Sequence, residues 1–136
     1  MPSIKLVKFN EKFLESIKDY KKIYLNPKKG IFYTITYGNK IAGVIGYIIK
    51  EGGKNILKIG IHQKYRGQDI FRNALDLLVK THKIKKIYST VLIANLASIK
   101  AHRKIGFRRI PKRIEEKLKT NGILLKRNTR MVKSFK

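Results

Sequence analysis

The sequence of 136 residues contains no cysteine and no tryptophan, and it has only 8 Asp and Glu residues against 33 Lys and Arg. The lack of cysteine excludes disulfides, thiolate metal ligands and cysteine nucleophiles, and it is natural in a reducing compartment. No apolar run approaches the length that crosses a membrane, and the N-terminal segment is charged where a signal peptide is apolar. We therefore expect a soluble, cytoplasmic protein that spans no membrane.

Histidine is scarce too, with one residue at each of positions 62, 82 and 102. These three share no spacing that suits a metal ion, and no cysteine could complete a ligand set, so no metal site is expected. No serine stands in the context of a nucleophile elbow either. The sequence therefore points away from metal-dependent and serine-based hydrolysis.

Positive charge is the most unusual feature of the composition, with a formal net charge of +25. The basic residues gather in three stretches: 83–86, 103–113 and 117–136. Self-repulsion on this scale disfavours a compact state, and a polyanionic partner such as tRNA or DNA would relieve it. The alternative is a compositional bias, in which Lys is abundant because the coding sequence is rich in A and T.

The length and the 43% hydrophobic content fit one domain with one core over residues 1–136. A strand is expected over residues 3–8, and Asn10 should cap a helix with Phe13, Ile17, Tyr20 and Tyr24 on one face. The turn at Gly38-Asn39 predicts a hairpin of two strands. The first half of the chain is thus expected to contain strands at residues 30–37, 40–50 and 56–61.

The second half alternates between helical and strand patterns. Apolar spacing and turn residues predict helices at 68–81 and 95–105, strands at 85–92 and 107–110, and a short helical turn at 112–119. A helix between strands 56–61 and 85–92 would make them parallel, with a right-handed crossover. Asn121-Gly122 predicts a hairpin turn before a last strand over residues 123–135, and the basic segment 111–136 is expected to be a hairpin or an arm.

Residues 57–78 combine a short apolar strand, a basic turn with a glycine and an amphipathic helix. The amides of a first helical turn point outward and carry the positive end of the helix dipole, so an anion docked there gains hydrogen bonds and favourable charge. Gly67 has no side chain to block a phosphate, and Lys64, Arg66 and Arg72 add positive charge. This stretch predicts a phosphate site, although the turn could also be a plain start of a helix.

Two motifs in this order resemble those of the GCN5-related N-acetyltransferase (GNAT) family. The first, IHQKYRGQD at residues 61–69, is similar to the loop that binds pyrophosphate, and the second, NLASIKAHRKIGF at residues 95–107, is similar to the helix and strand that follow it. The resemblance covers most of the chain. It implies an α/β fold with a mixed central sheet, splayed between its fourth and fifth strands and flanked by helices.

The resemblance also implies acetyl-CoA as the cofactor and direct transfer of the acetyl group to an amine. Ile61 and His62 would offer backbone hydrogen bonds to the pantetheine arm and the thioester carbonyl. The pyrophosphate would be held by Lys64, Arg66, Gly67, Gln68 and the positions from Asp69 through Ile70 and Phe71 to Arg72. In the second motif, Asn95 and Ser98 would meet the pantetheine arm, and Lys104 or Arg103 would lie near the CoA phosphates.

The chain departs from the family pattern at two positions. Asp69 stands where the family has Gly or Ala, so its carboxylate either opposes the pyrophosphate or compensates the helix dipole. His102 stands where the family places the Tyr that protonates the leaving thiolate. It could act as that general acid, or it could be a buried, hydrogen-bonded histidine. His62 is the candidate general base, and a water relay or an already neutral amine is the alternative.

The sequence thus predicts an acetyl-CoA-dependent N-acetyltransferase whose acceptor is a nucleic acid or a molecule bound to one. Lys83, Lys85, Lys86, Arg108, Arg109, Lys112 and Arg113 are the expected phosphate contacts. Tyr33, Tyr37 and Tyr47 could line the acceptor side or simply pack in the sheet. A protein or small-molecule amine remains an alternative acceptor. A non-catalytic basic binding module on a degenerate fold of this family is the second alternative.

Overall fold

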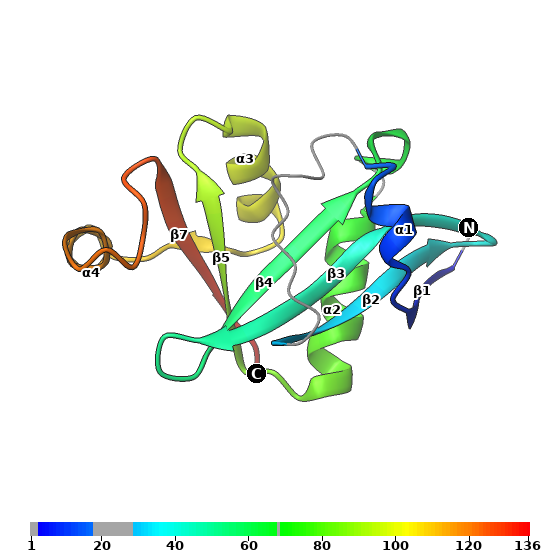
Figure 1. Ribbon diagram of the computed structural model, residues 1–136, viewed down its shortest axis with the longest axis horizontal. Coiled ribbons are helices and arrows are strands. Elements are labelled where there is room, and N and C mark those ends of the chain that lie inside the picture. Colours follow the sequence, from blue (N-terminus) through cyan, green and yellow to red (C-terminus); the bar gives the residue numbers. More distant parts are fainter. Residues whose placement is uncertain (1–2, 18–28, 68) are drawn as a thin grey trace. The chain divides into compact units, whose positions relative to one another are not determined.

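The computed structural model describes residues 3–17, 29–67 and 69–136, and the chain divides into two compact units. Unit 1 is Met1–Ile84 and unit 2 is Lys85–Lys136 (Figure 1). The single domain expected from the length remains a prediction. Within the described residues, no helix is long and apolar enough to cross a membrane.

Unit 1 is built on four antiparallel strands in the order β1-β2-β3-β4. They are β1 (Ile4–Lys8), β2 (Gly30–Tyr37), β3 (Lys40–Lys50) and β4 (Lys54–Ile61). The predicted turn at Gly38-Asn39 is confirmed, and Gly38 adopts the positive φ that such a turn requires. Seven consecutive residues of β3, from 42 to 48, are buried, which confirms β3 as the central strand that its apolar pattern predicted.

Gly46 on β3 faces Phe32 on β2, and a side chain there would overlap the Ile31 carbonyl oxygen and the Phe32 ring. Because the carbonyl belongs to the backbone of a paired strand, it cannot move away without disturbing the ladder. Gly46→Ala should therefore lower the free energy of unfolding by about 1–3 kcal/mol, the usual range for overpacking. Chemical denaturation of the variant measures this loss, and an unchanged midpoint would contradict it.

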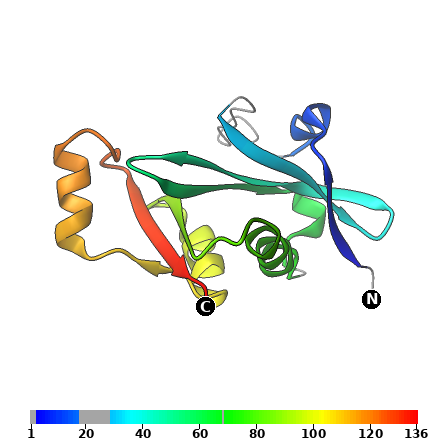
Figure 2. The same ribbon diagram turned by 90° about the horizontal axis from the view of Figure 1, so that it is seen from below.

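Two helices cover opposite faces of this sheet, as Figure 2 shows. Helix α1 (Glu11–Leu14) begins at Asn10, whose side chain accepts a hydrogen bond from the Lys12 amide as predicted. The later part of the predicted first helix, with Tyr20 and Tyr24, lies outside the described residues. Helix α2 (Ile70–His82) buries a stripe of apolar side chains against the sheet: Ile70, Ala74, Leu75, Leu78 and Val79.

His82, at the last turn of α2, contacts two tyrosines of the sheet. Its Nε2 lies 2.8 Å from the hydroxyl of Tyr33 on β2, and its ring meets the ring of Tyr47 edge-on at 5.5 Å. Burial, with Tyr33 nearby, raises the pKa of Tyr47. These contacts fasten the end of α2 to the sheet, which gives Tyr33 and Tyr47 the packing role that was the alternative to lining an acceptor site.

Unit 2 contains a second antiparallel set of strands, with β7 (Asn128–Ser134) between β5 (Lys86–Leu92) and β6 (Arg108–Arg109). Helix α3 (Leu96–Lys104) joins β5 to β6, and helix α4 (Lys112–Thr120) joins β6 to β7. The last strand is ordered and paired along its whole length, so the C-terminal segment is no free arm.

The predicted hairpin at Asn121-Gly122 is wrong, because the pair ends a helix. Asn121 is the C-terminal cap of α4, and Gly122 has a φ of +73° with its amide bonded to the Lys119 carbonyl. Both helix ends and tight hairpins need a residue that tolerates positive φ, so the local sequence does not distinguish them. The strand consequently starts at Asn128, five residues later than expected.

A buried carboxylate fixes α4 to β7 in unit 2. Glu115 accepts hydrogen bonds from the Thr129 hydroxyl at 2.5 Å and the Arg130 amide at 2.9 Å. Arg109 and Lys119 lie 3.4 and 3.5 Å from its other oxygen. Burial by itself would raise the pKa of Glu115, but these hydrogen bonds and charges outweigh burial and lower it.

Candidate functional site

The end of β4 positions the first residues of the predicted cofactor loop. The His62 amide donates to the Ala42 carbonyl at 2.8 Å, which continues the pairing of β4 with β3. Since backbone groups alternate in direction along an antiparallel strand, the amide and carbonyl of Ile61 point away from β3. Of the two residues expected to meet the pantetheine arm through their backbone, only Ile61 has this orientation, because the His62 amide serves the sheet.

A 3₁₀ turn, η2 (Gln63–Tyr65), follows and orders two side chains. His62 Nδ1 accepts a hydrogen bond from the Lys64 amide at 3.2 Å. Arg66 folds back so that its Nε donates to the Ile61 carbonyl at 2.9 Å. The other nitrogens of the guanidinium carry four of its five N–H donors, and Arg66 is exposed.

Gly67 makes the turn between η2 and α2. Its φ is +83°, and among the described residues no atom other than those of its chain neighbours lies within 4 Å of the position that a Cβ would take. The glycine is therefore needed for its backbone conformation, and the space beside it is open. Gln68, also expected to hold the pyrophosphate, lies outside the described residues.

Asp69 is the N-terminal cap of α2 and adopts a left-handed conformation, with φ of +57°. Its side chain makes no capping hydrogen bond, while its carbonyl accepts from the Asn73 amide at 3.2 Å. The family's Gly or Ala is replaced here by a residue that uses the conformation glycine prefers. At about 4 Å, an aspartate and a phosphate charge repel by about 1 kcal/mol in water and about 4 kcal/mol at a protein surface.

The residues around this turn fit a pyrophosphate group. Lys64, Arg66 and Arg72 are all exposed, and the amides of Ile70 and Phe71 lie in the first turn of α2. Open space at Gly67 leaves room for phosphate oxygens to approach the backbone. Three cations against the one carboxylate of Asp69 leave the loop electropositive.

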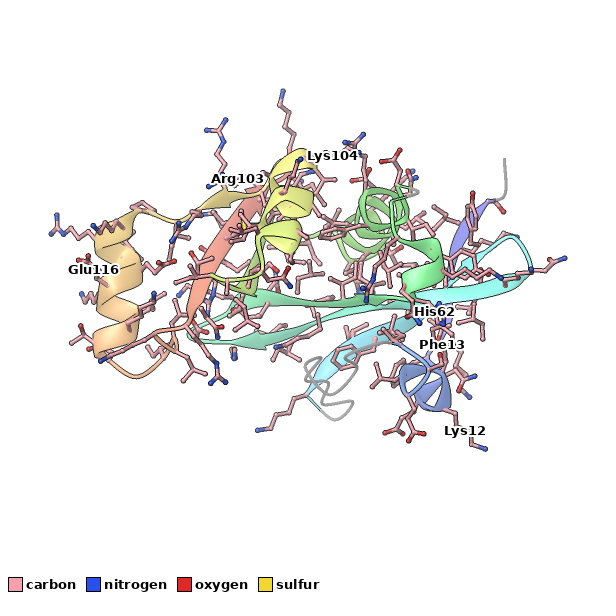
Figure 3. The ribbon with its side chains drawn as sticks, turned by 90° about the horizontal axis from the view of Figure 1, so that it is seen from above. Lys12, Phe13, His62, Arg103, Lys104 and Glu116 are labelled. Carbon is pink, nitrogen blue, oxygen red and sulfur yellow. The ribbon has the colours of Figure 1, made fainter. Side chains whose placement is uncertain are left out.

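A row of four aromatic rings lies beside the loop, and the sequence pattern had indicated only two of its members. Phe13 of α1 lies 6.3 Å from the His62 ring, which Figure 3 shows next to it. Tyr65 continues the row at 6.2 Å from His62, and Tyr37 at 5.9 Å from Tyr65. All four are half-buried. Phe13 was missed because α1 and the loop come together only in the fold, whereas Tyr65 lies within the loop itself, three residues after His62.

In unit 2, the second motif forms a connected chain of hydrogen bonds. Asn95 caps α3 by accepting from the Ser98 amide at 3.1 Å. The Ser98 carbonyl in turn accepts from His102 Nδ1 at 2.7 Å. His102 Nε2 lies 2.8 Å from the hydroxyl of Ser89 on β5, a buried serine that sequence reasoning had not singled out.

These contacts select one tautomer of the neutral His102 ring. A carbonyl can only accept, so Nδ1 carries the proton and Nε2 accepts from the Ser89 hydroxyl. Burial lowers the pKa of His102 although the bond to Ser98 works in the other direction, so the ring is neutral at pH 7. The ring also packs edge-on against Phe107 at 5.0 Å. This arrangement supports the structural alternative for His102 over a role as general acid.

The predicted phosphate contacts have different surroundings. Lys83, Lys85 and Lys86, around the end of α2 and the start of β5, are exposed, as are Arg108, Lys112 and Arg113 in unit 2. Lys104, the last residue of α3, also points outward (Figure 3). Arg109 differs, because its Nε donates to Thr129 at 2.9 Å and its terminal nitrogen meets Glu115.

Comparison with known proteins identifies the class. The sequence matches the acetyltransferase (GNAT) family over residues 4–107, and the chain belongs to this family. A comparison with curated proteins finds no match.

Solved structures share the fold at low sequence identity. IAA acetyltransferase from Bacillus cereus ATCC 14579 is 16% identical, with a TM-score of 0.68 over 99% of this chain and 100% of that chain. The Campylobacter jejuni N-acetyltransferase PseH, in complex with acetyl coenzyme A, is 12% identical. Its TM-score is 0.68, and the match covers 98% of this chain and 100% of that chain. Arabidopsis thaliana Naa50, in complex with the bisubstrate analogue CoA-Ac-MVNAL, is 21% identical. Its TM-score is 0.64, and the match covers 98% of this chain and 99% of that chain.

Family membership confirms several of the sequence predictions. The α/β fold of GNAT type, the N-acetyltransferase class and acetyl-CoA as the cofactor are all confirmed. The proteins above have different names and ligands on one fold, so the fold alone does not identify the acceptor.

Proposed function

We propose that this protein transfers the acetyl group of acetyl-CoA to an amine on, or bound to, a nucleic acid. When bound, acetyl-CoA supplies an acetyl group activated as a thioester. Its pyrophosphate would be held by Lys64, Arg66, Gly67 and the residues from Asp69 to Arg72 at the start of α2, together with Gln68, which lies outside the described residues. By the resemblance to the family motifs, Ile61 of unit 1 would contact the pantetheine arm, as would Asn95 and Ser98 of unit 2, and Lys104 would meet the phosphates.

The observation that supports this assignment most strongly is the turn at Gly67. Gly67 has a positive φ and open space where a Cβ would lie, and helix α2 starts three residues later at Ile70. Arg66 is held in place by the Ile61 carbonyl, which orders the cation before any ligand arrives. A preordered donor binds an anion with a smaller entropic cost than a mobile one.

His62, the candidate general base from the sequence, is proposed to take part through a hydrogen bond and not as a direct base. With the Lys64 amide donating to Nδ1, the neutral ring carries its proton on Nε2. It can therefore donate a hydrogen bond from Nε2, whereas a direct general base would need the Nδ1 lone pair that Lys64 occupies. Deprotonation of the amine through water, or binding of an already neutral amine, agrees better with this geometry. His102 positions α3 through Ser89 and Ser98.

The nucleic-acid part of the proposal is supported by charge and by the row of rings. Bases and other planar groups stack on aromatic side chains, and Phe13, His62, Tyr65 and Tyr37 present such faces next to the cofactor loop. Lys64 Nζ lies 5.8 Å from the centre of the Tyr65 ring, so a cation accompanies the row. A planar, anionic acceptor matches this combination.

Arg66→Ala tests the cofactor loop. Loss of charge-assisted hydrogen bonds to the pyrophosphate should cost about 1.5–3 kcal/mol, which corresponds to a Kd for acetyl-CoA about 10- to 100-fold higher. Titration calorimetry measures this Kd. Arg66→Lys keeps the charge but loses the hydrogen bond from Nε to Ile61. Its Kd for acetyl-CoA should lie between those of the parent and of Arg66→Ala.

Lys80→Ala, at an exposed position near the other end of α2, is the matched control and should bind acetyl-CoA as the parent does. Acetyl-CoA should also raise the melting temperature of the parent protein. No rise at millimolar acetyl-CoA, or equal binding by Arg66→Ala, would contradict the site.

Transfer of radiolabelled acetyl groups to tRNA tests the acceptor, and label found only on peptides or small amines would reject the nucleic acid.

A further inference from the structure

Charge is distributed unevenly between the two units. Unit 2 has 52 residues, with 16 of the 33 Lys and Arg but only 2 of the 8 Asp and Glu. The structure describes all of unit 2, and 13 of its 16 cationic residues are exposed. In the described part of unit 1, exposed cationic and acidic residues number 11 and 4. The excess of positive charge is therefore concentrated on the smaller unit.

The fold increases this excess by removing one of the two acids from the surface. Glu115 is 7% exposed, and its charge is balanced internally by Arg109 and Lys119. Glu116 is then the one exposed acid of unit 2, and Figure 3 shows it on the outer side of α4. Thirteen exposed cations against a single exposed acid make a surface of nearly uniform sign.

The direction of Glu115 also decides which residues of α4 face solvent. With Glu115, Leu118 and Lys119 turned inward, Lys112, Arg113 and Lys117 are exposed on the rest of the helix. The turn after α4 folds back on its last turn through the bonds from Ile123 and Leu124 to the Leu118 carbonyl. We call the exposed cations on β6, on α4 and in the segment between α4 and β7, apart from Arg109, the α4 surface: Arg108, Lys112, Arg113, Lys117, Lys126 and Arg127.

We propose that the α4 surface binds the phosphate backbone of a nucleic acid without reading its bases. This inference rests on the proposed function and names the part of the chain that would hold its acceptor. Phosphates along a backbone are regularly spaced single charges, and a row of flexible cations is the surface that neutralises them. Arg109 is exposed too, but it is left out of the contact because its guanidinium is hydrogen-bonded to Thr129 and paired with Glu115.

The competing occupant is an anionic lipid surface. Three partly exposed apolar side chains accompany the cations: Ile114, Ile123 and Leu125 are 51%, 47% and 53% exposed. Membrane-bound amphipathic helices, however, bury a broad apolar face, and α4 has only Ile114 as an exposed apolar residue among its nine positions. Charge therefore dominates this surface, which favours the nucleic acid.

Charge reversal on the full-length chain tests the proposal, with fluorescence anisotropy of a labelled 20-base-pair RNA duplex as the measurement. Lys112→Glu with Arg113→Glu places acids in the first turn of α4, where they suit the helix dipole and preserve folding. Lys50→Glu with Lys80→Glu makes the same change of net charge at exposed positions of unit 1. At 0.1 M salt, charges more than about 10 Å from the RNA are largely screened.

We expect the α4 double variant to bind at least about 10-fold more weakly than the parent at 0.1 M salt, and the slope of log K against log salt to become shallower by about 2. The unit 1 variant should bind within about threefold of the parent. Equal loss in both variants, a flat salt response of the parent, or binding of anionic vesicles with no binding of RNA would overturn the proposal.

The same measurements separate this inference from the proposed function. RNA binding is measured without acetyl-CoA, and acetyl-CoA binding is measured without RNA. If the parent binds RNA through the α4 surface but acetyl-CoA does not raise its melting temperature, the proposed cofactor site is rejected and the proposed role of the α4 surface is supported. If acetyl-CoA raises the melting temperature but the parent does not bind RNA through the α4 surface, the role of the α4 surface is rejected and the proposed cofactor site is supported.

Discussion

Glu115→Ala should lower the free energy of unfolding by about 3–5 kcal/mol, the range for breaking a buried, hydrogen-bonded charge pair. The substitution removes the acceptor of the Thr129 hydroxyl and the Arg130 amide, and both of these residues are buried. It also leaves the charge of Arg109 without its carboxylate. Denaturation in urea, followed by circular dichroism, measures the change.

Glu116→Ala is the matched control, since its neighbour in the sequence is exposed, and it should change stability by no more than about 0.5 kcal/mol. The response to pH gives an independent measurement. Because the folded protein lowers the pKa of Glu115, the stabilisation is complete above the unfolded value of about 4.3 and is lost as pH falls through the lower folded value. Glu115→Gln should reduce this loss of unfolding free energy at low pH. If the variant loses as much stability at low pH as the parent, the carboxylate contributes little.

His102→Ala should destabilise the protein by about 2–4 kcal/mol, because it opens a cavity and leaves buried polar groups without partners. The ring is 4% exposed, bonds to Ser89 and Ser98 and packs on Phe107. A structural role predicts lost stability, with kcat and the KM for acetyl-CoA changing together. A general acid would instead lower kcat at nearly full stability.

Two further measurements separate these roles of His102. Ser89→Ala removes only the hydroxyl that donates to Nε2, and it should cost less than His102→Ala. Since burial lowers the pKa of His102, the unfolded chain takes up a proton below about pH 6.5 while the folded chain does not. The stability of the parent should therefore fall as pH drops below 6.5, and His102→Ala should lose this part of the slope.

Local patterns were enough to predict the elements around the cofactor loop. The strand ending at residue 61, the turn at Gly67 and the helix over 68–81 correspond to β4, the observed turn and α2, with ends shifted by two residues or fewer. Their signals are local, because an apolar strand, a glycine and an amphipathic stripe each act through neighbours in the sequence. The same holds for Asn10 and Asn95, whose side chains cap the helices that follow.

Features set by contacts between distant segments could not be predicted in this way. His82 meets Tyr33 across 49 positions of sequence, and Arg109 meets Thr129 across 20. Neither pair has a spacing that indicates contact. The same limit applies to the row of rings, in which Phe13 and His62 come from different elements. The amino-acid composition gives the net positive charge of the chain. Only the fold shows that the Glu115 side chain is buried and does not offset the positive charge at the surface.

Asp69 combines backbone strain with a negative charge at the edge of the proposed cofactor loop. A left-handed conformation costs an aspartate about 1 kcal/mol that glycine would not lose. Glycine at this position would therefore relax the chain and remove a carboxylate from the edge of the phosphate loop at the same time. If the pyrophosphate is held there, the protein keeps a residue that loosens its hold on CoA. Weaker binding shortens the time for which free CoA stays bound after transfer. The next molecule of acetyl-CoA can then bind sooner.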